Sequence, residues 1–198
     1  MMSRESLLEL LEHARREVVS DPDARLSRPT RHRMWTVLGA AKDPQGWKQR
    51  ATLAIGSARR VLALWQAEFP EDELAAATLT TAEGVADQRL TRELGEKAWE
   101  RLRSFLEDLD EPESVANETN AGFACAQALR AALSDEILDE PEVTDDDLDY
   151  EQWDAAYYAC CAEAGDEGQA SNVARRRAFW DWYLGEWARI ALGEALGT

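Results

Sequence analysis

Apolar residues recur at spacings of three and four along almost the whole chain, and this periodicity constrains the fold more than any other feature. Such spacing places apolar side chains on one face of an α-helix, whereas a half-buried strand alternates them. The clearest stripe consists of Trp47, Ala51, Ala54, Ala58, Val61 and Trp65. Its three alanines would let a neighbouring helix approach closely. Valine, isoleucine and threonine are too scattered to build a sheet, so the sequence predicts an all-α fold.

Prolines divide this pattern into separate helices. Asp21-Pro22, Asp43-Pro44 and Phe69-Pro70 each interrupt the periodicity. Proline disrupts a helix interior but is favoured in the first turn, so these pairs mark helix boundaries. The chain has 198 residues, enough to bury the core of one domain. We therefore expect a single all-α domain over residues 1–198, folded as an orthogonal or irregular bundle of about seven to nine helices.

The chain has a net charge of −17, and all of the excess lies in its second half. Residues 1–104 carry 17 Lys and Arg against 16 Asp and Glu, whereas residues 105–198 carry 5 against 23. Such a charge repels nucleic acid and anionic membranes and attracts basic proteins. We therefore expect neither a nucleic acid nor a membrane as a partner. Solubility alone is the alternative explanation of the charge.

The acidic residues are densest between Asp135 and Asp154, where eleven of twenty residues are Asp or Glu. Pro141 interrupts the helical pattern there, so we expect a loop or an acidic surface segment. Carboxylates on such a segment suit a basic protein partner. The residues that we expect to contact this partner are Asp139, Glu140, Glu142, Asp145, Asp146, Asp147, Asp149 and Glu151.

The sequence contains no pattern that predicts a catalytic residue, a metal site or a cofactor. Its two histidines, His13 and His32, lie beside arginines, and neither begins a recognisable Ser/His/Asp or Cys/His arrangement. We expect both to be surface or loop side chains. Glycine-rich phosphate loops and the zinc motif H-E-x-x-H do not occur. The run that begins at Asp145 resembles the opening of a calcium loop, but Tyr150 and Ala156 stand where that loop requires glycine and glutamate.

The cysteines and the N-terminus bear on the cellular compartment. Cys125, Cys160 and Cys161 are odd in number, include an adjacent pair and form no C-x-x-C motif. This pattern favours small buried hydrophobic residues in a reducing compartment over disulfides or a zinc site. The N-terminus lacks the apolar run of a signal peptide, and no stretch approaches the ~18 apolar residues of a membrane span. We therefore expect a cytoplasmic protein.

The most aromatic stretch is RRRAFWDWYLGEW, over residues 175–187. On a helix its apolar side chains and Ile190 span an arc of ~200°, at ~100° per residue. An arc that wide predicts a central helix that packs on two or more sides. Arg176 and Arg177 are placed to cover Trp180 one turn later or to pair with an acidic residue. A direct role of this stretch in ligand binding is the alternative.

Three motifs stand out along the chain: VLALWQAEFPED over residues 61–72, WDAAYY over residues 153–158, and arginines followed by FWDWYLGE over residues 175–186. Together they resemble an all-α family of immunity proteins from bacterial polymorphic toxin systems, and the last motif is the most specific. The residues that carry the resemblance are Trp65, Phe69, Pro70, Trp153, Asp154, Tyr157, Arg176, Arg177, Phe179, Trp180, Trp182, Tyr183 and Glu186. The chain departs from the family pattern at Ala63, at Gln66 and after Glu186.

The resemblance implies a non-enzymatic protein that binds and neutralises one cognate bacterial toxin, as a monomer or a homodimer. The acidic surface would suit a basic toxin domain, such as that of a nuclease. One alternative is an acidic helical adaptor or DNA mimic that binds several basic proteins. Another is a metal-dependent helical-bundle hydrolase, whose candidate ligands would be Glu68, Glu71, Asp72 and Glu73.

Overall fold

The computed structural model describes residues 4–109, 116–135, 142–149, 152–165 and 170–193. Within these ranges the chain forms eight α-helices, the 3₁₀ helix η3 and no strand, which confirms the predicted all-α bundle. The elements are α1 (Arg4–Ser20), α2 (Arg28–Leu38), α3 (Pro44–Glu68), α4 (Leu74–Ala86), α5 (Arg92–Asp108), α6 (Ala116–Leu133), η3 (Asp145–Asp147), α7 (Ala155–Ala164) and α8 (Ala170–Ala191).

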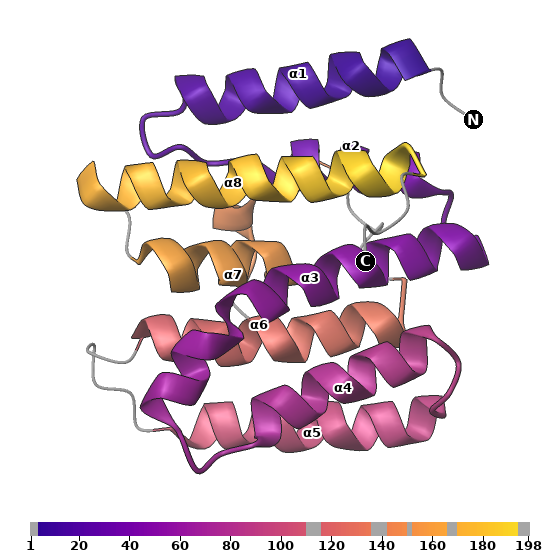
Figure 1. Cartoon of the computed structure of the whole chain (residues 1–198), viewed down its shortest axis with the longest axis vertical. Coiled ribbons are helices and arrows are strands. Elements are labelled where there is room, and N and C mark those ends of the chain that lie inside the picture. The colour runs from indigo at the N-terminus through magenta and orange to yellow at the C-terminus, as the bar shows by residue number, and fades with distance from the viewer. Residues whose placement is uncertain (1–3, 110–115, 136–141, 150–151, 166–169, 194–198) are drawn as a thin grey trace.

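The helices are stacked between two ends of the molecule (Figure 1). α1 lies at one end, α4 and α5 lie at the other, and α3, α6 and α7 lie between them. α6 is the central element because it contacts α3, α4, α5 and α7, with its largest contact against α3. Both helices bury alanines, among them Ala51, Ala58, Ala124 and Ala128. These small side chains let the two backbones approach closely.

Aspartates lie just before the starts of α3 and α4. The Asp43 carboxylate accepts a hydrogen bond from the backbone N–H of Gly46 at 2.9 Å and so caps α3. The Asp72 carboxylate accepts from the N–H of Leu74 at 2.9 Å and from the indole N–H of Trp65 at 3.1 Å. The Asp43 cap is worth ~1 kcal/mol. Asp72, which precedes the N-cap residue Glu73, ties the end of α3 to the start of α4.

α8 has the central position that its wide apolar arc predicts, since it contacts α1, α2, α3 and α7. Two indole hydrogen bonds join it to α2. Trp35 donates to the Tyr183 hydroxyl at 2.8 Å, and Trp187 donates to the Met34 carbonyl at 2.8 Å. Trp180 is only 1% exposed, so this ring belongs to the core.

The prediction for one histidine is wrong. His32 is 6% exposed and lies inside α2, not on the surface or in a loop. α2 is covered by α1, α3 and α8, and the His32 ring packs edge-on against Trp35 with ring centroids 6.4 Å apart. The neighbouring arginines favour a position of His32 in solvent, but one of them, Arg31, is itself buried. His13 is exposed, as expected.

The cysteines lie mostly in the core. Cys125 and Cys160 are buried, Cys161 is half-buried, and all three thiols are free. Burial raises the pKa of the Cys125 thiol to about 12, so this thiol stays protonated and unreactive at neutral pH. Every helix in the described ranges is too short or too polar to cross a membrane.

Candidate functional site

A buried cluster of charges centres on Arg31 of α2, which is 0% exposed. Its guanidinium contacts Asp145 of η3 and Asp154 in front of α7, which follow 114 and 123 residues later in the chain. A charge in the interior is costly unless it is paired and hydrogen-bonded. Here one cation joins two carboxylates, and this contact holds the acidic segment, residues 142–149, against α2.

Five hydrogen bonds use the full donor capacity of the Arg31 guanidinium. Nε and Nη2 donate to Oδ2 of Asp154 at 3.0 and 2.6 Å. Nη1 and Nη2 donate to the two carboxylate oxygens of Asp145 at 3.1 and 2.6 Å. Nη1 also donates to the carbonyl oxygen of Leu26 at 2.5 Å. Lysine could not reproduce this fork, because its ammonium group is a single point charge.

Aromatic rings enclose the same guanidinium. Its Cζ lies 5.4 Å from the ring centroid of Tyr157 and 5.5 Å from that of Trp180, within the range of cation–π attraction. Burial lowers the pKa of Arg31, but the charges and hydrogen bonds of Asp145 and Asp154 outweigh it and raise the pKa above its ordinary value. Arg31 is therefore charged at any physiological pH and acts as a permanent anchor.

The WD pair of the second motif joins this anchor to α7. Oδ1 of Asp154 accepts from the N–H groups of Ala156 and Tyr157 at 2.9 and 3.1 Å, so Asp154 caps α7 while its Oδ2 binds Arg31. The indole N–H of Trp153 donates to the backbone carbonyl of Asp145 at 3.0 Å. Asp154 therefore has two roles, as the cap of α7 and as a partner of Arg31.

The anchor leaves only part of the acidic segment in solvent. Asp145 is only 9% exposed, because its carboxylate binds Arg31 in the anchor. The Asp146 side chain is 78% exposed, and Glu142, Asp147 and Asp149 are exposed as well. These four are called the exposed carboxylates below. Asp139, Glu140 and Glu151, which the sequence groups with them, lie outside the described residues.

Local contacts fix the backbone beside the exposed carboxylates. The hydroxyl and the N–H of Thr144 donate to Oδ2 of Asp147 at 2.6 and 3.2 Å, and these bonds lower the pKa of Asp147. Arg28 donates to the Val143 carbonyl at 3.3 Å. Arg25 lies 3.8 Å from the carboxylate of Asp146 and partly neutralises it.

A hollow of about 180 Å³ adjoins this segment. Its lining combines both signs of charge, from α1, from the chain before α2 and from η3. The charged residues that line it are Glu17, Asp21, Arg25, Arg28, Asp145 and Asp146. The hollow is large enough for one side chain of a partner protein.

The third motif serves mainly to hold the helices together. Arg176 is buried and donates to the backbone carbonyls of Asp23 at 3.1 Å and Gly165 at 2.9 Å. It therefore does not take either position that the sequence predicts, over Trp180 or beside an acidic side chain. The cation over Trp180 is Arg31 instead. Among the other motif residues, Trp65, Phe179 and Tyr183 are buried, Phe69, Trp153, Tyr157, Arg177, Trp182 and Glu186 are partly buried, and Pro70 is exposed.

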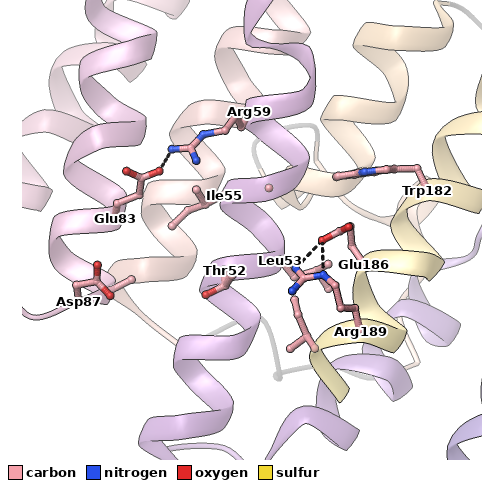
Figure 2. Close-up of a pocket in the computed structure, with 12 residues that line it drawn as sticks. Thr52, Leu53, Ile55, Arg59, Glu83, Asp87, Trp182, Glu186 and Arg189 are labelled. Atoms are coloured by element: carbon pink, nitrogen blue, oxygen red, sulfur yellow. Dashed lines mark hydrogen bonds and ion pairs between the residues drawn. The ribbon is translucent and has the colours of Figure 1, made fainter. Parts of the chain in front are cut away.

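A second concave surface, of about 250 Å³, lies between α3, α4 and α8 (Figure 2). Arg59 of α3 points towards Glu83 of α4 on one side, and Trp182 and Arg189 of α8 form the other side. Arg189 donates to Glu186 at 2.7 Å. Most of the charged side chains of this pocket thus pair with one another above an apolar floor. Such a lining suits an apolar side chain of a partner better than a chemical reaction.

Of the carboxylates considered as metal ligands, Asp72 has other partners. Within the described ranges, no three His, Cys, Asp or Glu side chains come together as a metal ion requires. Asp72 bonds to Trp65 and Leu74. Between Asp145 and Asp154, the guanidinium of Arg31 occupies the position that a cation would take.

Two buried arginines were not expected from the sequence. Arg31 is one of them, and Arg50 of α3 is another: it is 2% exposed and donates to the Asp135 carboxylate at 2.8 and 2.6 Å. Each is spaced three or four residues from a tryptophan of its own helix, Trp35 or Trp47. An arginine on an apolar helix face, in a chain with an acid-rich segment elsewhere, is the signal that could have revealed both.

Comparison with known proteins adds an independent finding. The sequence model of the protein family described as Immunity protein Imm5 matches residues 11–189. The matched region includes all three motifs and all three side chains of the Arg31 anchor. Among curated proteins, no sequence matches the chain.

Proposed function

Because the chain belongs to the Imm5 family of immunity proteins, we propose that it binds one cognate bacterial toxin and neutralises it without catalysing a reaction. The exposed carboxylates form the centre of the toxin-binding surface. Their partner is a basic toxin domain, for which a nuclease is one candidate. The protein acts in the cytoplasm, as a monomer or a homodimer, and binds neither nucleic acid nor membranes.

The observation that carries this proposal is the Arg31 anchor. It connects α2, η3 and α7 through buried, charge-assisted hydrogen bonds. As a result, Asp146 and Asp147 project from a backbone whose position is fixed before a partner arrives. A preorganised surface loses less conformational entropy on binding than a flexible acidic tail. The anchor therefore supports a specific protein interface at this segment.

The charge of the second half of the chain supports the same surface. Residues 105–198 carry 23 acidic side chains against 5 basic ones. Complementary charge steers a basic partner during diffusion and raises association rates by ~10–10³-fold. A protein that must capture a toxin before it acts benefits directly from fast association.

Co-expression tests neutralisation. Cells that produce the cognate toxin domain should survive only when the chain is co-produced. A variant with E142Q, D146N, D147N and D149N, called the segment variant, should protect poorly because it lacks the exposed carboxylates. Asp145 and Asp154 stay unchanged, so the anchor and the fold are kept.

The matched control carries E93Q, E96Q, E100Q and D108N on α5, and is called the α5 variant. These side chains are all exposed, and the variant changes the net charge by the same amount. It should protect as well as the wild-type chain. Equal protection by both variants would contradict a role for the acidic segment, and absence of protection by the wild type would contradict the immunity function itself.

The adaptor or DNA-mimic alternative differs in selectivity. An immunity protein should bind its cognate toxin domain far more tightly than an unrelated basic protein of similar charge. A DNA mimic should bind both with comparable affinity, because it relies on charge alone. Isothermal titration with the two partners distinguishes these functions.

A further inference from the structure

α1 carries two large apolar side chains that are exposed to solvent. Leu8 is 49% exposed and Val19 is 66% exposed. Isolated exposed apolar residues are common on proteins. These two, however, share one line along α1 with Glu12 and Arg15, which are exposed as well. We call these four residues the α1 stripe.

The members of the α1 stripe are spaced by four, three and four residues. At ~100° per residue their side chains fall within ~60° around the helix. This is the spacing at which a helix packs alongside a second helix. Glu17, which accepts hydrogen bonds from Ser27 and Thr30 beside α2, lies on the opposite side of α1. The stripe is thus turned away from α2, on a helix at one end of the molecule (Figure 1).

The α1 stripe is complementary to itself in one arrangement. If two α1 helices lie antiparallel with a twofold axis between residues 13 and 14, the numbers of facing residues add up to 27. Leu8 then faces Val19 of the second copy, and Glu12 faces Arg15 of the second copy. The twofold axis repeats both contacts. The result is two ion pairs in the middle of the seam and an apolar contact at each end.

We propose that the α1 stripe is the interface of a homodimer in which two copies of this chain pack antiparallel along α1. In this single register, opposite charges face each other and apolar side chains meet. The α1 stripe therefore fits a second copy of the same chain. A contact confined to one helix pair is smaller than the ~1,200–2,000 Å² of a stable complex, so the dimer is weak and forms at high concentration. The exposed carboxylates are not part of the stripe, and each copy keeps them.

Sedimentation equilibrium from micromolar to millimolar concentration tests this dimer without any toxin. The wild-type chain should show a concentration-dependent dimer. Glu12→Arg and Arg15→Glu each place like charges opposite one another twice, so each should weaken self-association by about tenfold or more. In an equimolar mixture of the two variants every changed side chain faces an opposite charge. The mixture should therefore form a heterodimer with close to wild-type affinity.

Glu100→Arg and Arg101→Glu, on the exposed surface of α5, are the matched controls with the same changes in charge. They should leave self-association unchanged, and circular dichroism should show the same helix content for all variants. A wild-type chain that stays monomeric, a mixture that fails to associate, or controls that weaken the dimer equally would overturn the proposal. Loss of toxin binding by E12R and R15E with a monomeric wild type would assign the stripe to the toxin and also overturn it.

Discussion

Arg31 is the side chain on which the position of the acidic segment most depends. Without it, Asp145 and Asp154 would remain buried, each only 9% exposed, and would lose their cation. Removing one partner of a buried ion pair costs ~3–5 kcal/mol. We expect Arg31→Ala to lower the free energy of unfolding by that amount, measured by urea denaturation.

Arg33→Ala is the control at this scale, because Arg33 follows two residues later in α2 and is exposed. Its guanidinium contacts the Thr30 hydroxyl at 3.2 Å, and its removal should cost less than ~1 kcal/mol. Similar losses of stability for the two variants would show that Arg31 is not an anchor.

At the residue scale, the sequence shows which chemical groups a segment carries, but it does not show which residues they contact. It shows that residues 135–154 are rich in carboxylates, but it could not show that Asp145 turns inward while Asp146 stays in solvent. That difference depends on a partner 114 residues earlier in the chain. The helical cap at Asp154 was foreseeable, because an N-cap depends only on neighbours two and three residues away.

At the scale of elements, two glycines distinguish a helix that borders open space from one in a tight contact. A Cβ added at Gly56 of α3 would meet no atom within 4 Å. A Cβ at Gly122 of α6 would lie 2.6 Å from the ring of Trp65 and 2.7 Å from Leu106. Gly56→Ala should therefore raise the free energy of unfolding by ~0.5–1 kcal/mol, whereas Gly122→Ala should lower it by ~1–3 kcal/mol.

Each of these variants is the control for the other, since the same methyl group is added to the interior of a long helix. Chemical denaturation under identical conditions measures both changes. Changes of the same sign would contradict the close contact that the structure shows between α6 and Trp65. Because Gly56 also lines the pocket of Figure 2, the added methyl group takes up a small part of that pocket.

The helices themselves could largely be predicted because their signals are local. The stripe from Trp47 to Trp65 lies in one helix, and Asp43 caps it. The packing partners could not be predicted, since contacts between helices depend on the whole fold. Arg176 illustrates this: its spacing suggested a contact with Trp180, but its hydrogen bonds go to Asp23 and Gly165.

At the scale of the whole molecule, α6 contacts α3, α4, α5 and α7, and α8 contacts α1, α2, α3 and α7. If residues 1–198 form the single domain that the length predicts, these shared contacts make unfolding cooperative. We expect one thermal transition by calorimetry, with equal calorimetric and van't Hoff enthalpies. Two separate transitions would contradict a single domain.

The charge distribution is the whole-molecule property most relevant to function. Composition alone reveals the acidic second half, and the three sequence motifs by themselves indicate the immunity family. The sequence predicts the acidic segment as the contact surface, but it cannot show which of its carboxylates lie in solvent. The structure narrows the proposal to the four exposed carboxylates beside the Arg31 anchor.

The most direct test of this proposal is the association rate of the chain with its cognate toxin domain, measured by stopped-flow fluorescence over a range of salt concentrations. The wild-type chain and the α5 variant should associate fast at low salt and slow down steeply as salt rises. The segment variant should associate ~10-fold or more slowly at low salt and depend little on salt. If the segment variant matches the wild type at every salt concentration, the acidic segment does not capture the toxin.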